Sequence, residues 1–91
     1  MNSRIRVAIQ RGPKSRAEQV AEGFTRVVNS YGCLLISPVD MDLDCRLRLT
    51  NRCTGQTVEG VVVWKGVRQV DGWELGVELI TANLEFWGLE L

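Results

Sequence analysis

The side chains best suited to chemistry are bases gathered at the start of the chain. The first sixteen residues hold Arg4, Arg6, Arg11, Lys14 and Arg16 and no acid, whereas every charged residue after Arg68 is Asp or Glu. Guanidinium groups bind anions through paired, charge-assisted hydrogen bonds. Two interpretations follow. The basic head pairs with the acidic tail inside the fold, or it forms a compact anion-binding cluster.

A second candidate is a row of alternating carboxylates, Asp40, Asp42 and Asp44. A calcium loop of the EF-hand type that began at Asp40 would need Gly at its sixth position and Glu at its twelfth. The chain has Cys45 and Asn51 there. We therefore interpret these aspartates as part of a solvated turn between two strands.

The third candidate is the set of cysteines, Cys33, Cys45 and Cys53. They form no CxxC pair and the chain has no His, so the sequence predicts no metal site. We expect three free thiols, with Cys33 and Cys45 as small core residues. Cys53 lies in a polar turn and is expected to be the most accessible of the three.

Catalytic machinery is not recognisable in the sequence. There is no His to act as a base, no GxSxG motif and no Gly-rich loop leading into a helix. Eleven bases balance eleven acids, whereas a duplex-nucleic-acid binder needs an excess of base. The chain also lacks a leader pattern and a membrane-length apolar run. We expect a cytoplasmic protein that is not an enzyme and has no catalytic residues, no cofactor, and no DNA, RNA or membrane partner.

The elements that must position these residues have the pattern of short β-strands. Apolar residues alternate with polar ones, or form short runs between turn residues. The expected strands cover residues 5–9, about 20–28, 31–36, 45–50, 57–65 and 73–79, with a polar loop at 66–72. Residues 15–23 fit either a short helix or a loop that leads into a strand, and we favour the loop. The sequence thus predicts an all-β fold, a small six-stranded antiparallel β-barrel that forms a single domain over residues 1–91.

The alternation also predicts which side chains fill the barrel. The expected core consists of Ile5, Val7, Ile9, Leu35, Leu47, Leu49, Val62, Leu75, Val77 and Leu79. The aromatic rings of Trp64 and Trp73 are expected on apolar faces. The apolar end of the chain, with Phe86, Trp87, Leu89 and Leu91, is expected to pack on the barrel or to form a homo-oligomer contact.

Three stretches, taken in order with the arginine-rich head, resemble a known family. They are Val27-Val28-Asn29-Ser30-Tyr31-Gly32-Cys33-Leu34-Leu35, Glu59-Gly60-Val61-Val62-Val63-Trp64 and Gly72-Trp73-Glu74-Leu75-Gly76-Val77-Glu78-Leu79. From about Arg4 to Leu79 the chain is similar to the PilZ domain, a six-stranded barrel family of bacterial receptors for the second messenger cyclic-di-GMP. The resemblance implies a bacterial signalling module.

The family's ligand motifs are an RxxxR before the first strand and a D/N-x-S-x-x-G after the second, and this chain departs from both. The resemblance implies ligand contacts from Arg4, Arg6, Asn29 and Gly32. Arg4 and Arg6 are two residues apart, and an RxxxR that ended at Arg6 would begin at Asn2. Asn29 stands at the Ser position and Val27 at the Asp/Asn position, where Val27 has no group that hydrogen-bonds.

These departures leave three functions open. The first is a cyclic-di-GMP receptor with weak or altered nucleotide binding. The second is a barrel that no longer binds the nucleotide and acts as an adaptor for an unknown protein partner. The third, an oligonucleotide-binding barrel, needs exposed aromatic residues among basic ones, and the expected inward Trp64 and Trp73 argue against it. The residues 29–32 are also consistent with a plain turn.

Overall fold

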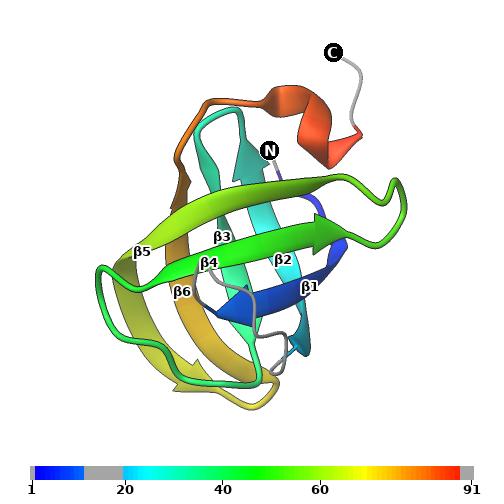
Figure 1. Ribbon diagram of the computed structural model, residues 1–91. Helices are drawn as coiled ribbons and strands as arrows, with labels where there is room; N and C mark the ends of the chain where they lie inside the picture. Colours follow the sequence, from blue (N-terminus) through cyan, green and yellow to red (C-terminus); the bar gives the residue numbers. More distant parts are fainter. Residues whose placement is uncertain (1, 12–19, 89–91) are drawn as a thin grey trace.

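Six antiparallel strands close on themselves into a barrel in the order β1-β2-β3-β6-β5-β4 (Figure 1). The computed structural model describes residues 2–11 and 20–88. The elements are β1 (Arg6–Arg11), β2 (Val20–Asn29), β3 (Gly32–Ser37), β4 (Arg46–Asn51), β5 (Thr57–Gln69), β6 (Gly72–Leu79) and the 3-10 helix η1 (Leu84–Trp87). The expected six-stranded antiparallel barrel is confirmed.

The side chains of the expected core fill the interior. All ten core residues named from the alternation are buried, with relative exposures of 8% or less. On β6, Leu75, Val77 and Leu79 point inward and alternate with outward Glu74, Gly76 and Glu78, because successive residues of a strand face opposite sides of the sheet. Cys33 and Cys45 pack against this core as expected.

β2 begins where it was expected to begin, whereas β5 extends well beyond its expected end. β2 starts at Val20, so residues 20–23 of the ambiguous segment are strand, and residues 15–19 lie outside the described part of the chain. The prediction of a polar loop over residues 66–72 is wrong. β5 continues to Gln69, whose backbone pairs with Gly72. Val67, near this end of β5, is 68% exposed. Backbone hydrogen bonding at this end therefore does not depend on an apolar face.

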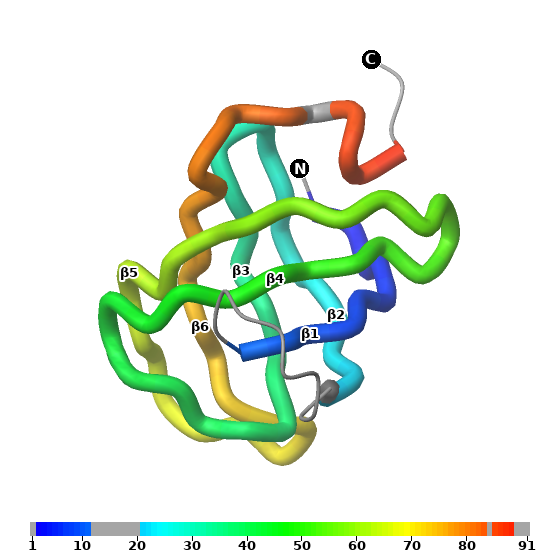
Figure 2. Tube along the Cα trace, viewed as in Figure 1, coloured from blue at the N-terminus to red at the C-terminus, as the bar shows by residue number. Residues whose placement is uncertain are grey.

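Side chains from two segments outside the strands close the two ends of the barrel. Met41, from the β3–β4 loop, is buried and joins the core at one end. At the other end, η1 lies across the opening (Figures 1 and 2), and Phe86 and Trp87 are 0% and 2% exposed. Asp40, Asp42 and Asp44 lie in the β3–β4 loop, as expected for a solvated turn. The expectation that the C-terminal aromatics pack on the barrel is confirmed for Phe86 and Trp87; Leu89 and Leu91 lie outside the described residues.

The N-terminal segment before β1 continues the pairing with β2. The Ser3 amide donates to the Arg26 carbonyl (3.0 Å) and the Thr25 amide to the Ile5 carbonyl (3.0 Å). The buried Thr25 hydroxyl donates to the Ser3 carbonyl (2.6 Å) and accepts from the Ile5 amide (3.0 Å), which satisfies it. One further bridge joins Asn2 to Val27. The segment that carries Arg4 is therefore held directly beside β2.

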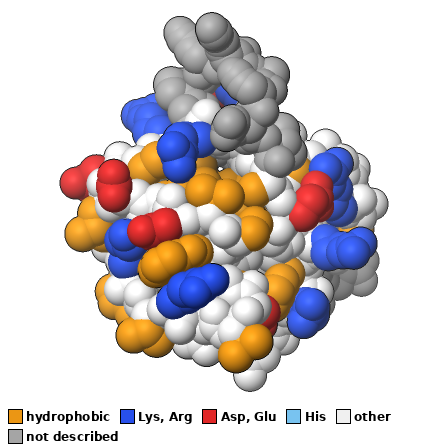
Figure 3. Space-filling model, turned by 90° about the horizontal axis from the view of Figure 1, so that it is seen from below, with side chains coloured by type: hydrophobic (Ala, Val, Ile, Leu, Met, Phe, Trp, Pro, Cys, Tyr) orange, Lys and Arg blue, Asp and Glu red, His pale blue; other side chains and the backbone are white. Residues whose placement is uncertain are grey.

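The end of the barrel opposite η1 has a mixed surface. It carries the β3–β4 loop and the β5–β6 turn (Figure 1), and seen from below it shows separate hydrophobic patches with Lys, Arg, Asp and Glu between them (Figure 3). Val39, Leu43 and Val70 contribute exposed apolar side chains to these two segments. No continuous apolar face is visible on this side of the described residues.

Candidate binding groove

A groove crosses the outer face of the barrel over β2, β3 and β6. It consists of two adjoining open hollows of about 350 Å³ and about 690 Å³, which share Val27 and Leu34 as lining residues. The smaller hollow extends to the β2–β3 turn and Glu78, and the larger one to the N-terminal segment and Asp71. Hollows of this size accommodate a small ligand or a few side chains of a partner.

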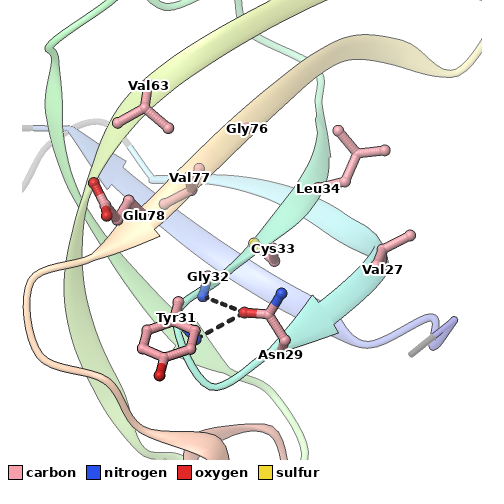
Figure 4. Close-up of a pocket in the computed structure, with 10 residues that line it drawn as sticks. All are labelled: Val27, Asn29, Tyr31, Gly32, Cys33, Leu34, Val63, Gly76, Val77 and Glu78. Atoms are coloured by element: carbon pink, nitrogen blue, oxygen red, sulfur yellow. Dashed lines mark hydrogen bonds between the residues drawn. The ribbon is translucent and has the colours of Figure 1, made fainter.

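The β2–β3 turn at one end of the groove is shaped by Asn29. Its Oδ1 atom accepts hydrogen bonds from the backbone amides of Tyr31 (2.7 Å) and Gly32 (3.1 Å), as Figure 4 shows. Such a side chain-to-backbone turn is typical of Asn. The interpretation of residues 29–32 as a turn is confirmed. The carbonyl oxygen of the side chain is thus used within the turn, and its Nδ2 atom is the group that remains to donate to a ligand.

Two glycines line the smaller hollow. A Cβ atom at Gly32 would collide with the Val77 carbonyl oxygen, so β3 approaches β6 closely here because residue 32 lacks a side chain. Gly76 lies beneath Trp64, whose Cβ would be 2.9 Å from a Cβ at residue 76. Leu34 pairs with Gly76 across the two strands and forms the apolar middle of the groove.

Arg4 is the base that the structure brings to this groove. Its guanidinium carbon lies 3.9 Å from the centre of the Phe24 ring, a cation–π geometry, and both residues line the larger hollow. Among the described residues, Arg4 forms no ion pair. Its charge is therefore available to an anionic group while Phe24 supports its guanidinium plane.

Arg6 lies elsewhere. It begins β1, does not line either hollow, and lies near Glu22. The pKa of Glu22 is lowered, mainly by its hydrogen bonds from Arg52, with a smaller contribution from the charge of Arg6. Of the four residues that the resemblance implied, the groove brings together Arg4, Asn29 and Gly32, and it does not include Arg6.

Charged residues that sequence reasoning did not assign to the site also line the groove. Arg26 lies on the larger hollow and forms an ion pair with Asp71 (3.3 Å) from the β5–β6 turn. Glu74 and Glu78 follow on the outward face of β6. The outward alternation of β6 was visible in the sequence, but its position beside β3 depends on barrel closure. The lining thus has two guanidinium groups and three carboxylates, a weak net preference against anions.

No base in the described part of the head forms an ion pair with an acid in the described part of the tail. Among the described residues, the ion pairs are Arg26–Asp71, Arg48–Glu59, Arg52–Glu22 and Lys65–Asp40, and none involves Arg4, Arg6 or Arg11. Lys14, Arg16 and Glu90 lie outside the described residues. The chain does contain one arginine pair at RxxxR spacing, Arg48 and Arg52. Both are held in ion pairs and neither lines the groove.

The expectation that Trp64 faces the interior is wrong. A register shift in β5 between Val62 and Trp64 turns both Val63 and Trp64 outward, and they are 50% and 49% exposed. Trp73 is half-buried and has the Arg68 guanidinium 5.6 Å from its ring centre. One argument against an oligonucleotide-binding barrel therefore does not hold, but the balanced charge still argues against it.

No cluster of three or more His, Cys, Asp or Glu side chains in the described part of the chain is suited to hold a metal ion. The cysteines are free thiols, and Cys53 is the exposed one, as expected. Burial raises the pKa of the Cys33 thiol to about 12. Within residues 2–11 and 20–88, no helix has the length and apolar character needed to cross a bilayer.

Comparison with known proteins gave no match: no family model, curated protein or solved structure resembles the chain closely enough to place it in a family. The fold and the groove are therefore the basis for function.

Proposed function

We propose that the chain is a non-enzymatic signalling module of the cyclic-di-GMP receptor class, a PilZ-like bacterial barrel whose groove binds the nucleotide weakly or in an altered manner. The observation that carries the proposal is the Asn2–Val27 bridge. It places the arginine-bearing N-terminal segment beside the strand that leads into the Asn29–Gly32 turn. Arg4 from the N-terminal segment and Asn29 and Gly32 from the turn thus line the same groove, whereas Arg6 does not.

The chemistry of the groove suits one phosphate and one flat base. Arg4 supplies a guanidinium group that is already supported on the Phe24 ring, so it needs little ordering to bind a phosphate or to stack on a base. The Nδ2 atom of Asn29 is a donor at the other end, and Leu34 and Gly76 offer an apolar floor between them. Pockets with an apolar floor and a few polar groups at the ends are typical of small-molecule sites.

Two missing contacts explain why binding is expected to be weak. Val27 lies where a hydrogen-bonding side chain belongs, and leaving a ligand polar atom unpaired costs about 1–3 kcal/mol. Asn2 lies where a second arginine belongs, and the loss of a charge-assisted bond costs about 1.5–3 kcal/mol more. Together these losses weaken a complex by roughly two to four powers of ten. Asp71, Glu74 and Glu78 act in the same direction by repelling the phosphates.

Restoring both contacts tests the proposal. Because residues 2 and 27 are bridged, the double variant Asn2→Arg with Val27→Asn adds a guanidinium and an amide to the same wall of the groove. An asparagine is preferable to an aspartate here, since a carboxylate at position 27 would pair with the new guanidinium at position 2. We expect cyclic-di-GMP to bind the double variant at least tenfold more tightly than the unmodified chain in calorimetry.

The matched control carries the same two new side chains in a different arrangement: Asn2→Arg with Val70→Asn. Val70 is fully exposed in the β5–β6 turn and does not line either hollow. An equal gain in both double variants would mean that added charge alone is responsible. No gain in the groove variant would remove the basis of the nucleotide proposal.

The second candidate function is the protein adaptor, and one observation favours it. The smaller hollow is bordered by the exposed side chains of Tyr31, Val63 and Trp64, together with Glu78. Exposed aromatic and branched side chains around an apolar hollow are common at protein interfaces. A partner that binds there should lose affinity on Trp64→Ala and keep it on Arg4→Ala, whereas nucleotide binding should depend on Arg4.

A further inference from the structure

The β2–β3 turn is attached on its other side to the C-terminal segment of the chain. Three successive carbonyl oxygens of the turn accept hydrogen bonds from the end of β6 and the residues that follow it. The Leu79 amide donates to Tyr31 (2.8 Å), the Asn83 amide to Ser30 (2.7 Å) and the Trp87 indole Nε1 to Asn29 (2.9 Å). A surface turn with three successive carbonyls bonded to one distant segment is held far more firmly than its exposed position requires.

The segment that supplies these donors is itself anchored in the barrel. The Phe86 and Trp87 rings meet edge to face with centroids 4.7 Å apart, and both are buried. The fully buried Asn51 side chain donates from Nδ2 to the Phe86 carbonyl (2.8 Å). Asn83 caps the start of η1 by accepting from the Phe86 amide (3.0 Å). Residues 80–88 are thus a fixed support for the turn.

The turn therefore lies between two features, the groove on one side and the buried Trp87 on the other. Asn29 belongs to both. Its side chain and Gly32 border the smaller hollow (Figure 4), while its backbone carbonyl accepts the hydrogen bond from the Trp87 indole. A ligand that contacts Asn29 or Gly32 requires the turn in its bonded shape. That shape depends on residues that the ligand does not contact.

We propose that the segment Ile80–Gly88 is the positioning element of the binding turn, with Trp87 as its positioning residue. Displacement of this segment loosens the turn and weakens binding in the groove. By thermodynamic linkage, a ligand in the groove stabilises the attachment of the segment by the same factor. The consequence for binding rests on the proposed function, whereas the attachment of the turn does not.

The test compares two tryptophan variants by amide hydrogen exchange in the absence of ligand. Trp87→Phe keeps an aromatic ring and removes the indole donor. Trp73→Phe makes the same change at the other end of β6. In Trp87→Phe we expect exchange at the Gly32 and Asn83 amides to become about fivefold to tenfold faster, the effect of one lost hydrogen bond. The exchange rates of the same two amides should be unchanged in Trp73→Phe.

The amide of Val62, which donates to the Cys45 carbonyl, reports on the rest of the barrel. Faster exchange at the Gly32 and Asn83 amides, with unchanged exchange at the Val62 amide, supports the proposal. Unchanged exchange at the turn, or an equal acceleration at all three amides, overturns it, because either result makes Trp87 a general packing residue.

The unmodified chain provides a second arm that does not depend on whether Trp87→Phe folds. As urea is added, the Gly32 amide, the Asn83 amide and the Trp87 indole N–H should exchange with one common opening free energy, since they belong to one unit. Separate opening free energies for the turn and the indole would contradict the proposal.

A titration with cyclic-di-GMP distinguishes the two proposals from each other. If groove amides shift and the indole resonance of the buried Trp87 shifts with them, the coupling is supported. If groove amides shift and the indole does not, the coupling is overturned while the proposed function stands. If neither shifts, the proposed function fails, and the exchange results alone decide whether Trp87 positions the turn.

Discussion

A single side chain, Asn29, shows how the role of a residue divides between fold and site. Its type and its place before Gly32 were visible in the sequence. Its Oδ1 atom, however, accepts from two amides of its own turn and is not available to a ligand. Gly32 is likewise explained by the close approach of β3 to the Val77 carbonyl. Both residues line the groove, but their first role is to shape the turn.

At the residue scale, the thiols differ in reactivity. At pH 8, Cys53 should react quickly with a thiol reagent and Cys33 slowly, because Cys53 is exposed and burial raises the pKa of Cys33 to about 12. Counting the fast-reacting thiols of the native chain, with Cys53→Ser as control, checks this. Fast labelling that persists at full amplitude in Cys53→Ser would contradict it.

The same pKa shift predicts a dependence of stability on pH. The folded chain keeps the Cys33 thiol neutral up to about pH 12, whereas the unfolded chain releases this proton from about pH 9, the ordinary value being 9.0. The stabilisation is therefore fully present below pH 9 and is lost as the pH rises from 9 towards 12. Urea unfolding at pH 8 and pH 10 should show a smaller loss in Cys33→Ala than in the unmodified chain. Equal losses in both chains would show that Cys33 does not contribute.

At the scale of elements, alternation predicted strands well wherever one face is buried, as in β4 and β6. It failed at the C-terminal end of β5, where Val67 is exposed and the backbone pairing with β6 continues without an apolar face. It also failed at Trp64, because the register shift after Val62 changes which face the next residues occupy. A bulge of this kind depends on the neighbouring strand, and a single segment does not reveal it.

The closing role of η1 leads to a stability prediction. Phe86 is fully buried over the open end of the barrel, so Phe86→Ala should lower the free energy of unfolding by about 3–5 kcal/mol. Deletion of residues 84–91 should lower the melting temperature at least as far. Val70→Ala, at a fully exposed position, is the control and should have little effect. A deletion variant with unchanged melting and sedimentation would contradict the closing role.

A second prediction at this scale concerns the strand that borders the groove. Leu75 is fully buried on the inner face of β6, opposite Leu35 across the strand pair. Leu75→Ala should cost about 2–4 kcal/mol in urea unfolding because it leaves a cavity in the core. The same measurement on Glu74→Ala, one residue away and outward, should show a change below about 0.5 kcal/mol. Similar costs for the two variants would contradict the assignment of inner and outer faces.

At the scale of the whole molecule, barrel closure creates what the sequence alone could not show. Alternation predicted the core, because burial of one face fixes which residues are apolar. The strand order, in which β6 lies between β3 and β5, brings Glu74 and Glu78 to the groove and lets Asp71 pair with Arg26. The hydrogen bond from Trp87 to Asn29 joins residues 58 positions apart. Such contacts depend on the closed topology and leave no local pattern.

The most direct test of the account is a titration of the unmodified, isotope-labelled chain with cyclic-di-GMP, followed residue by residue in solution. The account predicts binding in the range of about 0.1–10 mM. Shifts should centre on the amides of Arg4, Val27, Leu34 and the 29–32 turn, and Arg4→Ala should abolish them. Cyclic-di-AMP at equal concentration should produce smaller shifts. Two results would contradict the central claim. One is that the groove amides do not shift even at the highest nucleotide concentration. The other is tight binding that Arg4→Ala leaves unchanged.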